Sequence, residues 1–136
     1  MKLLMFQARR FWFRAFERIL DTAEETDAQA EVQDAAVIFL HAEAIDEIQK
    51  GKALTKAVKN VKWLANKCGL KNVVLHSFTH LGGDTASPEF AQDFLEAMAR
   101  RLCDTGYQVW ITPFGYVCEW DISVYGESLA KVFKAF

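Results

Sequence analysis

The sequence is poor in proline and cysteine, and it has no long apolar run. Its 136 residues include two prolines and three cysteines. The cysteines, at positions 68, 103 and 118, form no C-x-x-C pair and no Cys/His cluster with zinc-binding spacing. That pattern argues against a disulfide framework and a structural metal site. No apolar run approaches the ~20 residues that span a bilayer. These absences predict a reduced, cytoplasmic protein without a membrane segment or a metal.

The composition is that of an ordinary globular protein. Apolar residues make up 51% of the chain and charged residues 25%, which excludes a disordered chain. The length suits one hydrophobic core, so we expect a single domain over residues 1–136. The opening segment, residues 1–13, has a charge and a short apolar run but no small-residue cleavage site. It is interpreted as a strand rather than a signal peptide.

The charges are distributed unevenly. The net charge is -2, whereas dedicated nucleic-acid binders are usually basic. Arginines crowd residues 9–18, acidic residues fill 21–34, and lysines gather between residues 50 and 71. Two interpretations stay open here. One is a set of solvated faces with an acidic loop, and the other is a local basic face for RNA.

Short apolar runs and alternating patterns predict the strands, and residues 21–34 are predicted to form a long polar loop. In residues 116–124, Tyr116, Cys118 and Trp120 share one predicted face with Ile122 and Val124. The predicted strands cover residues 2–7, 9–16, 35–43, 72–78, 107–112 and 116–124.

Helical spacing appears in two longer segments. Residues 52–68 place apolar side chains on one face and lysines on the other, and Gly69 follows as a C-terminal cap. Ser87 and Pro88 are typical of a helix start, and Gly106 ends that second helix. Residues 127–136 are predicted to form a short terminal helix. The fold class is therefore α/β (α+β), with a mixed sheet of about five to six strands and two main helices in the order β-β-β-α-β-α-β-β.

Candidate chemistry lies at strand ends, where open α/β sheets tend to bind ligands. His41, His76 and His80 are near such ends, as is the "PFGY" corner. A three-histidine metal site, a Cys118–His nucleophilic pair and a phosphate cradle at "HLGGD" are the specific hypotheses. The plain alternatives are structural histidines, an inert core thiol and an ordinary turn.

Several motifs in order carry a family resemblance. They are "FTHLGG" at 78–83, "ASPEFA" at 86–91, "GYQV" at 106–109, "PFGY" at 113–116 and "ISVYGESLA" at 122–130. Together they resemble the editing domain of archaeal threonyl-tRNA synthetases. The resemblance covers most of the chain.

That resemblance implies a fold like that of D-aminoacyl-tRNA deacylases, and a homodimer. It implies hydrolysis of Ser-tRNA(Thr) by a water that backbone groups and the substrate's 2′-hydroxyl position, with no metal and no cofactor. A second hydrolytic site is needed because one methyl group supplies only ~1–3 kcal/mol of discrimination. The implied partners are the tRNA 3′ end carrying an amino acid and a threonyl-tRNA synthetase.

The resemblance also assigns site residues by position. His80 is the motif histidine beside the terminal nucleotide, and we place it among the catalytic residues together with Cys118. His41 and Ala42 match the pocket wall, and His41 offers a hydrogen-bond donor there. The remaining substrate-binding positions are Phe78, Thr79, Pro113, Phe114, Gly115, Tyr116, Val117 and Lys131.

Three positions depart from the family pattern. An aromatic residue and then a lysine usually follow "PFGY", where this chain has Val117 and Cys118, and a glutamate after "Leu-Ala" has become Lys131. The resemblance implies that this lysine positions substrate and water. The departures keep two alternatives open. One is a non-catalytic module that binds tRNA or a synthetase, and the other is a deacylase for D-aminoacyl-tRNA.

Overall fold

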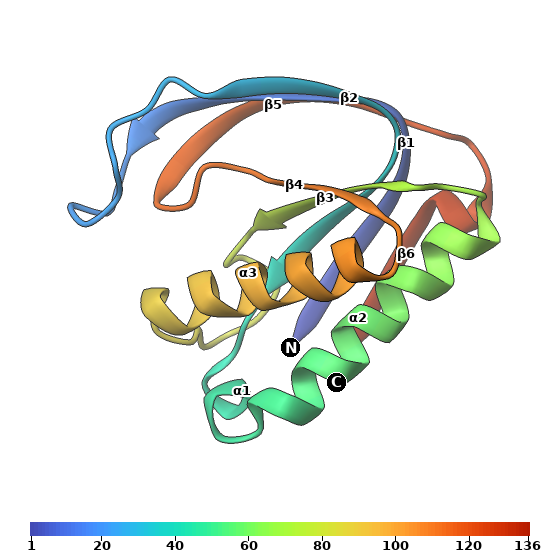
Figure 1. Cartoon of the computed structure of the whole chain (residues 1–136). Coiled ribbons are helices and arrows are strands. Elements are labelled where there is room, and N and C mark those ends of the chain that lie inside the picture. Colours follow the sequence, from blue (N-terminus) through green and yellow to red (C-terminus); the bar gives the residue numbers. More distant parts are fainter.

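The computed structural model describes all 136 residues, as six strands with helices covering one face of the sheet (Figure 1). The strand order is β4-β3-β2-β1-β5, and β6 also pairs with β1. Pairs β2–β3 and β3–β4 are parallel and all others are antiparallel. The predicted mixed-sheet fold class is confirmed. The strands are β1 (Lys2–Arg18), β2 (Gln29–His41), β3 (Asn72–Ser77), β4 (Gln108–Ile111), β5 (Tyr116–Val124) and β6 (Lys131–Ala135).

Strand β1 is one continuous strand, so the prediction of two strands over residues 2–16 is wrong. Its first half pairs with β6 and its second half with β5, while β2 runs beside both halves. The polar residues that suggested a break sit on it without interrupting it. Arg9 donates to Ser123 Oγ at 2.9 Å, and Arg10 donates to Asp121 at 3.0 Å. Strand β1 curves along its length (Figure 1), and its register against β5 shifts between Ala8 and Arg10.

Two further boundaries differ from the prediction. The polar loop is shorter than expected, because β2 already begins at Gln29 and pairs with the end of β1. The predicted terminal helix is instead a 3-10 turn, η1 (Ser128–Ala130), followed by β6. Strand β6 pairs with residues 2–6 of β1. This long-range pairing overrides a spacing of apolar residues that suits a helix equally well.

The two main helices are confirmed and lie on one face of the sheet (Figure 1). Helix α2 (Lys50–Lys67) follows the five-residue α1 (Ala44–Ile48), and Gly69 adopts a positive φ of 67° just after it ends. Helix α3 (Pro88–Asp104) begins where the Ser87 side chain accepts a hydrogen bond from the Phe90 N–H at 3.2 Å. Ser87 thus marks the start of α3, and Gly69 marks the end of α2, as the local sequence predicts.

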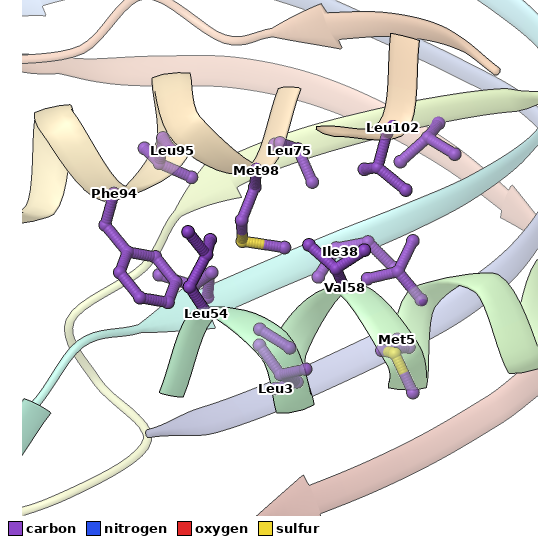
Figure 2. Close-up of a cluster of buried hydrophobic side chains, with 14 of the residues drawn as sticks. Leu3, Met5, Ile38, Leu54, Val58, Leu75, Phe94, Leu95, Met98 and Leu102 are labelled. Atoms are coloured by element: carbon purple, nitrogen blue, oxygen red, sulfur yellow. The ribbon is translucent and has the colours of Figure 1, made fainter. Parts of the chain in front are cut away.

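The main core fills the space between the helices and the sheet. Figure 2 shows Leu3 and Ile38 of the sheet meeting Leu54 of α2 and Met98 of α3. Each such side chain contributes roughly 1.5–3 kcal/mol when it is buried. No helix is both long and apolar enough to span a membrane.

The opposite face of the sheet carries a smaller, aromatic cluster. Phe39 lies at its centre, with ring centroids 5.5 Å from Phe6, 5.4 Å from Trp120 and 4.8 Å from His76. Trp120 is 40% exposed. In Figure 1 strands β1 and β5 curl over this face of the sheet, and the helices lie on the other face.

A charged cluster ties the end of β2 to the chain terminus. The α-amino group of Met1 donates to Glu43 at 2.6 Å and lies 3.0 Å from buried Asp46. Burial alone would raise the pKa of Glu43, but hydrogen bonds from Lys2 and from the amino group outweigh it, so the pKa is lowered. Glu43 therefore stays ionised, and this pairing fixes the segment that follows His41.

Candidate functional site at the Pro113–Tyr116 corner

The segment Pro113–Tyr116 is a sharp corner that joins β4 to β5. Gly115 has a φ of 83°, and its carbonyl oxygen accepts hydrogen bonds from the N–H groups of Ile19 at 2.8 Å and Leu20 at 3.1 Å. A Cβ at this position would lie 2.7 Å from the Cβ of Ala23. Both the conformation and the close approach demand glycine.

Tyr116 ties the corner to the loop after β1. Its hydroxyl donates to the carbonyl of Glu24 at 2.7 Å and accepts from the N–H of Thr26 at 3.0 Å. An open cleft of about 630 Å³ lies between this loop and the corner. Because both of its hydrogen bonds are made within the chain, the Tyr116 hydroxyl is a structural support.

A second cavity, here called the corner pocket, lies on the other side of the corner. It has a volume of about 280 Å³. It sits where the parallel strands β3 and β4 end and α3 begins, which is the usual ligand position in sheets of parallel strands. Its lining residues are Ile19, Leu20, His76, Ser77, Thr79, Thr85, Ala86, Pro88, Ala91, Thr112, Pro113, Phe114, Gly115 and Tyr116.

Five of the residues expected at a substrate site line the corner pocket. They are Thr79 and the four corner residues, Pro113 to Tyr116. Four polar lining residues are not among the expected substrate-site residues: His76, Ser77, Thr85 and Thr112. The sequence places His76 near a strand end and in the three-histidine metal hypothesis, but gives it no substrate-binding role. His76 is two residues after Val74, so the strand pattern predicts that both side chains lie on the same face of β3.

His76 is held firmly in the pocket wall. Its side chain is 7% exposed, and its Nδ1 lies 2.8 Å from the Thr112 hydroxyl oxygen. The ring of Phe39 packs edge-on against the imidazole at 4.8 Å. Burial lowers the pKa of His76 to about 4. The imidazole is therefore neutral at physiological pH.

The other two histidines take different positions. His41 is 1% exposed, its Nδ1 accepts from the Leu81 N–H at 3.0 Å, and its Nε2 lies 2.7 Å from the Asp84 carbonyl. It thereby anchors the loop that carries His80. His80 is exposed, and its ring meets that of Phe78 edge-on at 5.2 Å.

The structure does not bring the three histidines together with carboxylates or thiols. No group of three or more His, Cys, Asp or Glu side chains is placed to hold a metal ion. Ala42 is buried, and its carbonyl accepts from the Ala86 N–H at 2.9 Å, which joins the loop to β2. His41, Ala42, Phe78 and His80 thus frame the loop beside the corner pocket without lining it.

The remaining candidates lie on the outer strands. The Cys118 sulfur is 3.9 Å from the carbonyl oxygens of Pro113 and Tyr116, behind the corner, and burial raises the pKa of its thiol. Val117 is exposed beside it, and Lys131 is exposed at the start of β6. None of the three lines the corner pocket. The catalytic roles of Cys118 and His80 stay predictions.

The mixed six-stranded sheet with its helices has a D-aminoacyl-tRNA deacylase-like fold. The c-Myc DNA Unwinding Element Binding Protein has a similar solved structure, with a TM-score of 0.69 over 100% of this chain and 99% of that one. At 14% identity, this likeness shows the fold alone.

Sequence comparison then gives the family. The model for the Archaea-specific editing domain of threonyl-tRNA synthetase matches residues 1–136, so the chain belongs to that family and the predicted family is confirmed. The threonine–tRNA ligase of Staphylothermus marinus is 30% identical over 98% of this chain, and that of Thermofilum pendens is 30% identical over 97%. The chain spans 22% of the length of each of these relatives.

Gly115 is the position of the corner that leaves no room for a side chain. We expect Gly115→Ala to lower the free energy of unfolding by about 3 kcal/mol, because it combines a positive φ with a steric overlap. Denaturant unfolding followed by tryptophan fluorescence measures the effect. Gly83→Ala is the matched control, since a Cβ there meets no atom within 4 Å. Equal losses in the two variants would contradict the prediction.

Proposed function

We propose that the chain is an aminoacyl-tRNA editing hydrolase whose substrate is serine mischarged on tRNA(Thr). The observation that carries the proposal is the corner pocket, which gathers Thr79 and the four residues of the "PFGY" motif at the ends of β3 and β4. The membership of the chain in the editing-domain family supports the same reaction. Ester hydrolysis here means that water adds to the carbonyl carbon and that the bond to the ribose oxygen then breaks.

The lining of the pocket suits a small polar acyl group. It offers hydroxyl groups from Ser77, Thr79 and Thr85, and no Asp, Glu, Lys or Arg lines it. A site that supplies neutral donors and backbone groups depends on the substrate's own 2′-hydroxyl to place the water. Serine and threonine differ by one methyl group, which gives the charging step too little discrimination between them. A second, hydrolytic site supplies the discrimination that is missing.

The deciding experiment compares deacylation of L-Ser-tRNA(Thr) and L-Thr-tRNA(Thr) by the purified chain. We expect release of serine above the buffer rate, with Thr-tRNA(Thr) more than tenfold slower. Cys118→Lys restores the family lysine, and a faster rate in this variant would mean that the lysine is what limits the wild-type chain. His80→Ala is expected to slow the reaction. Activity on D-aminoacyl-tRNA alone would replace the proposal with the D-specific alternative.

Absence of turnover at stoichiometric enzyme would overturn the hydrolase. Retained tRNA binding would then favour the second candidate, a non-catalytic module that binds tRNA or a synthetase. The observation behind this candidate is that Cys118 and Lys131 occupy the positions of the family lysine and glutamate.

A tRNA substrate needs a basic surface, and helix α2 offers one. The helix carries six lysines and no acidic residue, and none of these lysines forms an ion pair within the chain. A shallow hollow of about 470 Å³ lies beside three basic and two aromatic residues: Lys56, Lys59, Lys134, Trp63 and Phe136. Lysines with an exposed aromatic ring favour a nucleic-acid strand, because the lysines neutralise phosphates and the ring stacks on a base.

We expect neutralising this surface to weaken tRNA binding about tenfold or more at low salt. Each lost phosphate contact should also reduce the slope of log affinity against log salt by roughly 0.7–0.9. Fluorescence anisotropy with uncharged tRNA(Thr) at several salt concentrations measures both quantities. The test variant is Lys56→Gln, Lys59→Gln and Lys62→Gln combined.

The matched control removes the same charge from β1, through Arg9→Gln, Arg14→Gln and Arg18→Gln combined. We expect it to bind tRNA nearly as the wild type does. An equal loss of affinity in the control would show that only net charge matters, and would contradict a binding surface on α2.

We also propose that the domain forms a homodimer. The support is Trp120, which is 40% exposed although its ring packs on Phe39 and Phe11 of the aromatic cluster. A second copy would cover this ring. Sedimentation equilibrium should give twice the mass of one chain, and Trp120→Lys should give one. Ile48→Lys, which replaces an exposed apolar residue of α1, should leave the mass unchanged. A monomeric wild type would overturn the proposal.

A further inference from the structure

His76 is the one titratable group of the corner pocket that is free to meet a ligand. The only other titratable lining residue is Tyr116, whose hydroxyl is already used by Glu24 and Thr26. The imidazole of His76 packs against the rings of Phe39, with a centroid separation of 4.8 Å, and Phe78, at 6.1 Å. A group this firmly held presents one defined nitrogen to the pocket.

The hydrogen bond to Thr112 identifies which ring nitrogen carries the proton. Thr112 is 4% exposed, and its hydroxyl makes no hydrogen bond other than the 2.8 Å contact with Nδ1 of His76. The buried hydroxyl proton has only this acceptor, and an unpaired buried donor is costly. The arrangement that satisfies this proton within the protein is the one in which Thr112 donates to Nδ1. A neutral imidazole has a single N–H, so in His76 it is the one on Nε2.

The protein leaves the Nε2 atom of His76 without a hydrogen-bond partner, and His76 lines the pocket. Solvent also reaches this atom. Asp46 Oδ1, which lies elsewhere, is the only side-chain polar atom that has no partner and is sealed from solvent. Nε2 therefore presents an unsatisfied N–H to whatever enters the pocket.

The other histidines cannot take this part. Both ring nitrogens of His41 are used, by the Leu81 N–H and the Asp84 carbonyl. His80 is exposed and does not line the pocket. His76 is the only one of the three that both lines the pocket and keeps a ring nitrogen without a partner in the chain.

We propose that the Nε2–H of His76 is a fixed, neutral hydrogen-bond donor that binds the carbonyl oxygen of the aminoacyl ester. The inference rests on the proposed hydrolase function. When water adds to the carbonyl carbon, the carbonyl oxygen gains negative charge, and the N–H stabilises it without transferring its proton. The carbon–oxygen bond to the ribose then breaks, the oxyanion returns to a carbonyl, and the ribose oxygen leaves as a hydroxyl group that carries the proton lost by the water. Thr112 is the positioning residue, because it holds the tautomer that leaves this N–H in the pocket.

The mutational test separates donor loss from structural damage. His76→Phe keeps a ring of similar size but no donor, and we expect kcat for Ser-tRNA(Thr) to fall about a hundredfold with little change in KM. His76→Gln restores an N–H donor and should recover part of that loss. Thr112→Val should lower kcat several-fold, whereas Thr112→Ser, which keeps the hydroxyl, should stay near the wild type. Full activity in His76→Phe would overturn the inference.

Nitrogen-15 NMR of the wild-type chain tests the tautomer without any activity. The chain has three histidines, and comparison with His76→Phe assigns the signals of His76. At pH 7 we expect Nδ1 to give the signal of an unprotonated nitrogen and Nε2 that of a protonated one. The reverse pattern, or averaged signals, would overturn the inference. A wild type that releases no serine would overturn the proposed function, and the NMR result would still stand on its own.

Discussion

Two hydrogen bonds to a single carbonyl oxygen determine whether this molecule has a pocket. The N–H groups of Ile19 and Leu20 both donate to the carbonyl of Gly115, at 2.8 and 3.1 Å. They bring the end of β1 against the turn between β4 and β5, which lie at opposite edges of the main sheet. The corner must adopt a positive φ at Gly115 to present that carbonyl. The corner pocket and the open cleft on its other side share the walls that result.

The helices were predictable because their signals are local. Serine before proline starts α3, and glycine follows α2, so a short window of sequence is enough. The two strand errors came from pairing between distant residues. Nothing near Arg9 indicates that Ser123 will partner it and let β1 continue, and nothing near Lys131 indicates that β6 will lie beside residues 2–6. Sheet pairing is decided by tertiary contacts, which a single sequence does not display.

The site was predictable to the extent that it is made of backbone. The corner "PFGY" and Thr79 are recognisable as motifs, and all five residues line the pocket. The contribution of Thr112 was not predictable, because its hydroxyl matters only through its distance to His76, 36 residues away in sequence. Cys118 shows the converse. A motif position identified it, but its sulfur lies behind the corner against two carbonyl oxygens.

The absence of charged side chains from the pocket lining has an energetic consequence. A lysine in a site this enclosed loses hydration unless a carboxylate compensates for it, and burial lowers the pKa of an unpaired amine. A neutral N–H avoids that loss, because burial already lowers the pKa of His76 to about 4 and keeps the imidazole uncharged. Its dipole is oriented by Thr112 before any substrate arrives, so little reorganisation is needed when charge develops. A pocket built on fixed neutral donors therefore needs no charged side chain in its lining, and none lines it.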